Sequence, residues 1–372
     1  MEPKFDDIRP YNDEETAAAM RRLAVSPAIY MIEKFLFEDK EQGYLSSLVE
    51  EINSVEEYQT KVMSEFVNRI IEQTTSGLTV SGLDHFITSD GSLGKFLLLS
   101  THRDIILDPA FVQITLMKEK MPLTEIAAGD NLISVPSVGD MIRSNRMIKV
   151  VRSGNARELY KAATLLSEYI RRQISGNHNS IWLAHRQGRS KDGHDATEQG
   201  LIKMLSMSGS GNFVDDFAEL NIMPMAVSYE YETCGASKAM QIWQKQREGF
   251  YKKKVGEDLV SMIDGIRQFK GRVHIEFCKP LTREELEEAD SAGKNERFRA
   301  LASIIDKKIL PAFKLWPSNY IASDLLSGTN TYKKYYTEEQ KDAFWEHIEK
   351  ETLRMPNDAK NILLGIYSAH IL

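Results

Sequence analysis

The stretch KFLLLSTHRDIILDPAF, residues 95–111, joins a short apolar run to a polar loop and then to an apolar helical pattern. A continuous run of four to eight apolar residues is typical of a strand that is buried on both faces. The residues after the loop, PAFVQITLMKEKM, continue long enough to favour a helix over a second strand. The stretch therefore predicts a strand, a loop and a helix, which is the repeating unit of α/β folds.

The same unit recurs along the middle of the chain. Further apolar runs end in polar or glycine-containing loops, and helical patterns such as residues 156–174 lie between them. We expect an α/β fold in which a central, mostly buried sheet is flanked by helices. Polar clusters follow several of these runs, at the strand ends where open α/β sheets bind ligands. The expected strands cover residues 95–100, 123–129, 147–151, 180–185, 222–230 and 272–277.

Helical patterns dominate both ends of the chain, whereas the expected strands occupy its middle. This change of period predicts three parts. We expect an N-terminal helical domain at residues 1–75, an α/β domain at residues 76–285 and a C-terminal helical extension at residues 286–372.

The composition narrows the classes of protein. The chain has 372 residues, of which 42% are hydrophobic and 27% charged, as in ordinary globular proteins. Its net charge of −7 argues against general nucleic-acid binding, but residues 101–200 hold 14 Lys and Arg against 11 Asp and Glu. The middle of the chain is therefore suited to an anion. Two cysteines offer neither a disulfide framework nor a zinc cluster.

The N-terminal sequence and the lengths of the apolar runs predict where in the cell the protein lies. The acidic start, MEPKFDDIRPYNDEE, lacks the positive and apolar regions of a signal peptide. No run approaches the roughly 20 apolar residues of a membrane-spanning helix. We expect a cytoplasmic protein.

A protein kinase is one alternative for the polar loop, because residues 102–104 are His-Arg-Asp. A kinase needs an Asn five residues after the Asp to hold magnesium, but this position is Pro109. The segment GSLGKF also fails as a phosphate-binding loop, since Ser89 and Phe96 replace two required residues. The sequence argues against a kinase.

An acyltransferase is the second alternative for this loop. A histidine near neutrality can take the proton of an acceptor hydroxyl, and a carboxylate can orient its ring. His102 follows the expected strand, and Asp108 before Pro109 has the form of a helix N-cap with proline at the first helical position. The N–H groups at the helix start would then be near a developing oxyanion. The alternative interpretation is that Asp108 only caps the helix and that His102 is an ordinary loop residue.

Four ordered blocks of sequence resemble the glycerolipid acyltransferases, in particular the glycerol-3-phosphate and 1-acylglycerol-3-phosphate acyltransferases. The resemblance covers about residues 82–282, and its strength lies in the order of the blocks. The fourth block is followed by GRVHIEFCKPLT, which is similar to that family's ending. The blocks are THRDIILDPAF, AAGDNLISVPSVGDMIRSNRMIKVVRSG, IWLAHRQGRSKDG and NIMPMAVSYE.

The resemblance implies a role for each matching residue. His102 would be the general base and Asp108 its partner, although the family spacing ends on Leu107. Asp104 is therefore the second choice for the partner. The third block has Arg186 and Gln187 in place of the family's Glu-Gly. The remaining implied residues are Arg152, Arg189 and Lys191 for the acceptor phosphate, Gly188, Ser190 and Gly193 for their loop, Lys149 and Arg186 as weaker cations, and Pro224 on the acyl-donor side.

The activity that the resemblance implies is transfer of a fatty acyl group from acyl-coenzyme A or acyl carrier protein to the hydroxyl of glycerol-3-phosphate, in phospholipid biosynthesis. Lysophosphatidate or another lipid acceptor is the runner-up. No metal and no bound cofactor are expected. A catalytically inert lipid- or acyl-binding protein is the alternative from another class, because of the extra residue between His102 and Asp108.

The product of such a reaction belongs in a bilayer, so peripheral membrane contact is a further hypothesis. Three segments are amphipathic or basic enough to provide it. They are SPAIYMIEKFLFEDK, KQREGFYKKK and NILLGIYSAHIL, at residues 26–40, 245–254 and 361–372.

Overall fold

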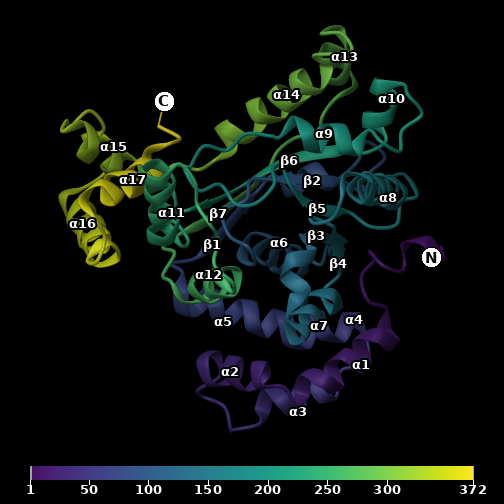
Figure 1. Ribbon diagram of the computed structural model, residues 1–372, viewed down its shortest axis with the longest axis horizontal. Coiled ribbons are helices and arrows are strands. Elements are labelled where there is room, and N and C mark those ends of the chain that lie inside the picture. The colour runs from purple at the N-terminus through teal and green to yellow at the C-terminus, as the bar shows by residue number, and fades with distance from the viewer. Residues whose placement is uncertain (1, 372) are drawn as a thin grey trace.

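The computed structural model describes residues 2–371, apart from the side chain of Ser134. A seven-stranded sheet lies at its centre with helices on both sides, which confirms the expected α/β class (Figure 1). The strands follow the order β1-β7-β6-β2-β5-β3-β4 across the sheet. They are β1 (Leu78–Ser81), β2 (Leu97–Ser100), β3 (Glu125–Gly129), β4 (Met147–Val150), β5 (Ile181–Ala184), β6 (Ile222–Tyr229) and β7 (Val273–Phe277).

Six of these strands match expected ones, and β1 was missed. Its four residues LTVS are half-exposed at the edge of the sheet, so they lack the apolar run that marks the central strands. β6 and β7 pair antiparallel, whereas every other neighbouring pair is parallel. Strands β2 to β6 therefore end at one edge of the sheet, and the loops that follow them meet there.

Alternate residues of the central strands point into two hydrophobic cores, as the two-residue period of a strand requires. Leu98 and Trp182 belong to one core, and Leu97, Leu99 and Leu183 to the other. The first core is covered by the N-terminal helices and by the helix after β2, and it includes their buried residues. These helices are α1 (Asp13–Ala24), α2 (Pro27–Leu36), α3 (Tyr44–Glu50), α5 (Ser64–Thr74) and α6 (Leu107–Lys118), with a π-helix at Tyr58–Met63.

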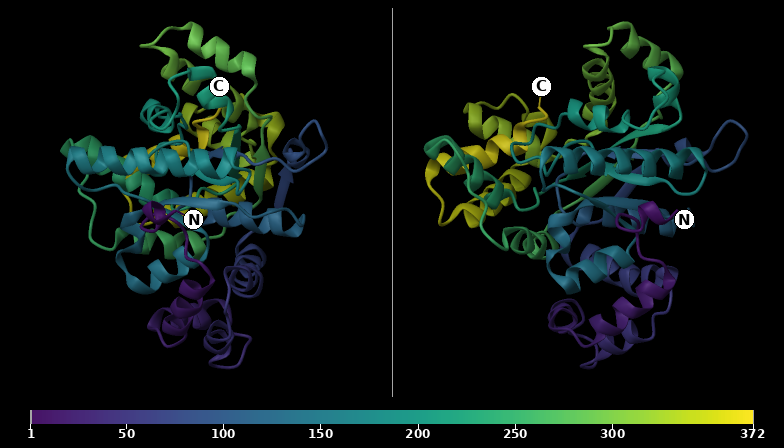
Figure 2. Two further views of the ribbon diagram at one scale, coloured as in Figure 1. Left: turned by 90° about the vertical axis from the view of Figure 1, so that its right-hand side faces the viewer. Right: turned by 45° about the vertical axis from the view of Figure 1, so that its right-hand side comes forward.

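The second core lies on the opposite face of the sheet (Figure 2). Helix α13 spans the expected boundary at residue 285, and α14 packs on β6. Sequence that follows the α/β part therefore contributes to its covering layer. The helices of this face are α8 (Ala156–Ser175), α9 (Gln199–Leu205), α10 (Phe213–Ala218), α13 (Arg283–Ser291) and α14 (Arg297–Ala312).

A third, smaller core holds a helical bundle beside the sheet. It is formed by α11 (Gly235–Glu248), α15 (Pro317–Ser327), α16 (Glu338–Thr352) and α17 (Asn357–Ser368). α17 contains most of the apolar segment at residues 361–372, whose last residue lies outside the described part. Its residues Leu363, Leu364 and Ile366 are buried in the bundle. Within residues 2–371, no helix is long and apolar enough to cross a bilayer.

Candidate active site

His102 and Asp108 form a hydrogen-bonded pair in the loop between β2 and α6. Nδ1 of His102 lies 3.1 Å from Oδ2 of Asp108. The imidazole also meets the edge of Trp182, at 5.8 Å between ring centroids. The pair forms although one residue more than in the family pattern separates the two side chains.

Asp108 is fully buried and receives several hydrogen bonds. Its Oδ2 accepts the backbone N–H groups of Arg103 at 2.6 Å and Asp104 at 2.9 Å, in addition to the histidine. Its Oδ1 accepts the hydroxyl of Tyr229 at 2.7 Å. The loop therefore wraps around this carboxylate, which stabilises a buried negative charge.

Tyr229 was missed in the sequence, where its only signal is its place at the end of β6. Burial, and then the nearby charge of Asp108, raises the pKa of Tyr229 well above its ordinary value. The phenol thus stays protonated and remains a donor to Asp108 near neutral pH.

Asp104, the second choice for the partner of His102, has another role. Its Oδ1 accepts the N–H groups of Ile106 and Leu107, both at 2.9 Å. α6 begins at Leu107, so Asp108 lies in the first turn and the expectation of an N-cap at Asp108 was wrong. The physical reason is that Asp104 satisfies the amides at the helix start, which frees the Asp108 carboxylate to turn back to the loop.

The same contacts correct the expected oxyanion site. The amides of Ile106 and Leu107 are already bound by Asp104, and those of Arg103 and Asp104 by Asp108. These four N–H groups are therefore engaged and do not point to a reacting carbonyl in this structure.

A cavity of about 160 Å³ opens beside His102, at the carboxyl ends of the strands. It brings together five residues that the sequence singled out: His102, Arg152, Gly188, Arg189 and Lys191. Apolar side chains of strands, of α6 and of the segments that follow β2 and β3 form another part of its wall, including Ile105, Pro109, Ile126, Leu132 and Trp182. A small cavity with one charged and one apolar side suits a polar headgroup next to an acyl chain.

Arg152, Arg189 and Lys191 are free of ion pairs to carboxylates within residues 2–371. Nη1 of Arg189 is buried and has no hydrogen-bond partner among these residues. Burial, followed by the charge of Arg189, lowers the pKa of Lys191. Unpaired cations that crowd each other at the wall of a cavity are stabilised by a bound anion.

The other expected residues lie outside the cavity lining. Ser190 is buried and its N–H donates to the carbonyl of His102 at 2.7 Å, so it joins the third block to the loop between β2 and α6. Lys149 pairs with Asp7 at 2.6 Å, and Arg186 donates to the carbonyl of His194. Pro224 lies inside β6 opposite Leu99, away from the cavity.

Helix α12 (Glu257–Arg267) forms a wall of the cavity that sequence reasoning did not predict. Glu257 accepts Gln241 Nε2, and Asp258 accepts Asn131 Nδ2, both at 2.8 Å. Asp258 also pairs with Lys253. Both carboxylates are therefore engaged with neutral amides or a lysine, which leaves the arginines of the cavity free of them.

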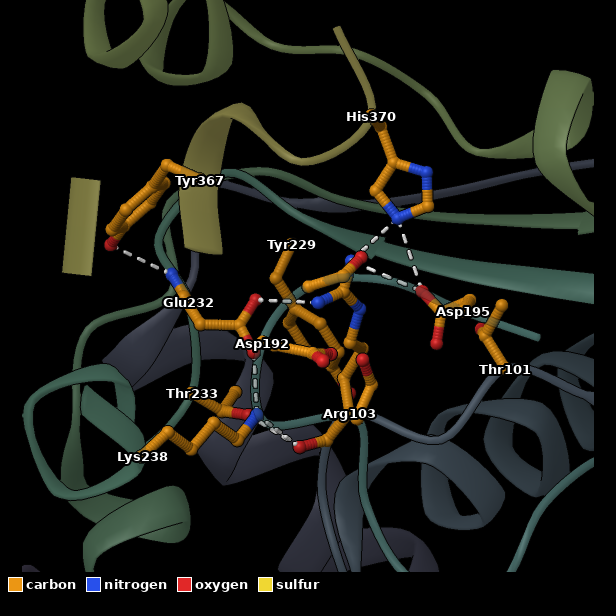
Figure 3. A network of polar contacts seen from close by, with 12 residues as sticks. Thr101, Arg103, Asp192, Asp195, Tyr229, Glu232, Thr233, Lys238, Tyr367 and His370 are labelled. Atoms are coloured by element: carbon orange, nitrogen blue, oxygen red, sulfur yellow. Dashed lines mark hydrogen bonds and ion pairs between the residues drawn. The ribbon is translucent and has the colours of Figure 1, made fainter. Parts of the chain in front are cut away.

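Arg103, next to His102, is the centre of a buried polar network (Figure 3). Its guanidinium contacts Asp195 at 3.2 Å, His370 at 2.8 Å and the carbonyl of Gly193 at 3.4 Å. Burial alone would raise the pKa of Asp195, but the charge of Arg103, together with the nearby His185 and His370, holds it well below its ordinary value. The network ties the loop between β2 and α6 to the third block and to the C-terminal tail.

Glycine at position 193 is required by this packing. Its φ is +81°, and a Cβ there would lie 2.4 Å from the carbonyl oxygen of Ile366 in α17. The loop that carries Arg189 and Lys191 is thus fixed from one side by the C-terminal helix.

No protein-family model matches the sequence, and no curated protein is similar to it in sequence. Among solved structures, the 1-acyl-sn-glycerophosphate acyltransferase of Thermotoga maritima is similar to this chain, with a TM-score of 0.39 and 12% identity. The match covers 78% of this chain and 92% of that one. This likeness is too weak to establish a shared family or activity. The chemistry of the cavity is therefore inferred from the residues of this chain.

Proposed function

We propose that this protein is an O-acyltransferase that moves a fatty acyl group from a thioester to the hydroxyl of a phosphate-bearing acceptor. The observation that carries the proposal is the His102–Asp108 pair beside a cavity with three cations that no carboxylate among residues 2–371 pairs with. The pair supplies a base for a hydroxyl, and the cations supply a site for the acceptor's anion.

His102 acts as the general base. Its Nδ1–H donates to Asp108, which leaves Nε2 free to take the proton of the acceptor hydroxyl. The hydroxyl oxygen attacks the thioester carbonyl, the carbon–sulfur bond breaks, and the departing thiolate receives the proton from the imidazolium. Asp108 stabilises the charged ring during the transfer, and Tyr229 holds Asp108 in place.

Arg152, Arg189 and Lys191 bind the phosphate of the acceptor. Arginine grips phosphate with two N–H groups and stays charged, whereas lysine adds a point charge. A cavity of about 160 Å³ is small beside the roughly 300–1,000 Å³ of pockets for larger ligands, which favours glycerol-3-phosphate as the acceptor. Lysophosphatidate is the second candidate, with its acyl chain outside the cavity.

The donor is acyl-coenzyme A or acyl carrier protein, and the protein would act in phospholipid biosynthesis. An inert lipid-binding protein is the competing function, and it would have no need of the buried carboxylate that orients His102. The hydrogen bond between His102 and Asp108, at 3.1 Å, beside a cavity whose cations have no carboxylate partner in the described chain, favours the enzyme.

The test is acyl transfer by purified protein from labelled acyl-coenzyme A and acyl carrier protein, with glycerol-3-phosphate and lysophosphatidate as parallel acceptors. We expect activity with one acceptor, and a loss of about 100- to 10,000-fold in kcat in His102→Ala. The matched control is His178→Ala, because this histidine is exposed after α8, away from the cavity. Equal activity of wild type and His102→Ala would refute the base, and no transfer with any pair would favour the inert protein.

A further inference from the structure

Helix α12 buries Met262 and packs Ile266 against the first core, but it also leaves other apolar residues exposed on its outer side. Glu257 and Asp258 face the cavity, whereas Leu259, Val260 and Ile263 are exposed. At 3.6 residues per turn, the three exposed residues lie on one side of the helix. A surface helix normally buries its apolar side and exposes its charges, so the outer face of α12 lacks a partner within the described chain.

The orientation of α12 is fixed by contacts on its inner side. A Cβ on Gly265 would lie 2.3 Å from Oδ2 of Asp104, so the helix backbone packs directly on the catalytic loop. Its Ser261 carbonyl accepts the thiol of Cys234, and Arg267 lies over the ring of Phe35. The helix cannot turn its apolar side inward without losing these contacts and those of Glu257 and Asp258. Figure 1 shows α12 between α11 and α5, at the border of the α/β part.

The loop before α12 also exposes apolar and basic residues, directly before the helix begins. Val255 is fully exposed, and Phe250 is 62% exposed. Lys253 pairs with Asp258, whereas within residues 2–371 no carboxylate lies at ion-pair distance from Lys252 or Lys254. We call these residues together the α12 surface: Phe250, Lys252, Lys254, Val255, Leu259, Val260 and Ile263.

We propose that the α12 surface docks on an anionic lipid bilayer. Apolar side chains flanked by lysines enter the boundary between headgroups and acyl chains, and the lysines attract anionic lipid. The charge is local, since the chain as a whole carries −7, so attraction to such a bilayer would orient this face toward it. An acidic carrier protein would match the lysines but not five exposed apolar side chains.

This surface also borders the cavity, because Lys253, Glu257 and Asp258 of the same segment line it. If the proposed function holds, docking there would place the cavity at the lipid interface, where an acyl chain too large for it can remain in the bilayer. The inference rests on the proposed function only for this role of docking, which is to bring the cavity to the acyl chain. Docking itself follows from the exposed face.

The first experiment measures membrane depth by spin labelling. A nitroxide on Ile263→Cys is compared with one on Leu353→Cys, an equally apolar exposed position between α16 and α17. Both native cysteines are buried, so the label reaches the new one. With vesicles of phosphatidylcholine and phosphatidylglycerol, we expect oxygen to reach label 263 better than a polar nickel chelate does, with no such change at 353. The same response at both positions, or at neither, would overturn the proposal.

The second experiment measures flotation with these vesicles and with pure phosphatidylcholine. The double variant Val260→Ser, Ile263→Ser should reduce binding to anionic vesicles by about tenfold or more. Leu353→Ser is the matched control and should bind as wild type does. Exposed Val and Ile contribute little to folding, and unchanged thermal unfolding would verify this for each variant.

Flotation of His102→Ala separates the two proposals. This variant should float as wild type does, since His102 is not part of the α12 surface. An inactive wild-type protein that floats would refute the enzyme alone. An active wild-type protein that never floats would refute docking. Protection of the α12 surface from cysteine labelling by acyl carrier protein, and not by vesicles, would also refute it.

Discussion

At the scale of single residues, Asp108 explains how the loop between β2 and α6 holds its shape. A buried carboxylate is costly unless it is paired and hydrogen-bonded, and this one receives four donors from the loop and from β6. Two of the donors are backbone amides of the residues that separate it from His102. The extra residue of the loop is therefore absorbed by its turn around the carboxylate.

We predict that Asp108→Asn lowers kcat by about 100- to 10,000-fold, because a neutral amide no longer fixes the tautomer or stabilises the imidazolium of His102. Steady-state acyl transfer measures the effect. Asp104→Asn is the matched control, since the amide oxygen can still accept Ile106 and Leu107. Equal losses in both variants would contradict the assignment of Asp108 as the partner.

At the scale of elements, the sheet gathers the loops after β2, β4 and β5 at one edge. His102 follows β2, Arg152 follows β4, and Arg189 follows β5. None of the three is close to another in sequence, yet all line one cavity. Parallel strand direction is what makes their carboxyl ends meet.

We predict that Arg189→Gln raises the KM for the phosphate acceptor by about 10- to 100-fold with kcat nearly unchanged, since a charge-assisted hydrogen bond contributes about 1.5–3 kcal/mol. The same variant should unfold at no lower temperature without substrate, because its buried guanidinium nitrogen has no partner among residues 2–371. Arg186→Gln, in the same loop but outside the cavity lining, should leave KM as it is. A fall in kcat alone would contradict phosphate binding.

At the scale of the whole molecule, the C-terminal bundle holds parts of the site in place. Arg103 and Asp195 contact His370, and α17 packs on Gly193. His347 is half-buried in the bundle beside Tyr367, whose hydroxyl lies 3.3 Å from the Nε2 of His347. Burial, followed by the charge of Lys350, lowers the pKa of His347 to about 4.

This shift predicts a dependence of stability on pH. The unfolded chain takes up the His347 proton near pH 6.5 and the folded chain only near pH 4, so acid favours unfolding. His347 should therefore contribute stability above pH 6.5 that is lost as the pH falls toward 4, amounting to roughly 3 kcal/mol at about 1.4 kcal/mol per pKa unit.

Denaturant unfolding on both sides of this window measures the loss. His347→Gln keeps a hydrogen-bond acceptor but does not titrate, so its stability should fall less on acidification than that of wild type. The difference between the two proteins is the relevant quantity, because carboxylates such as Asp195 weaken both in acid. Parallel curves would contradict the prediction.

The sequence alone determined the α/β class and six of the seven strands, because buried strands leave local patterns. His102, Arg152, Arg189 and Lys191 were singled out by the resemblance of ordered sequence blocks to the glycerolipid acyltransferases, and the structure places all four around one cavity. It could not find the edge strand β1, whose short half-exposed run carries no such pattern. Only the tertiary structure decided that Asp108 rather than Asp104 pairs with His102, since local spacing allowed both. Tyr229, His370 and α12 reach this loop from distant positions in the chain. The packing of β6, the C-terminal tail and α12 against one loop is a long-range property that no local pattern encodes.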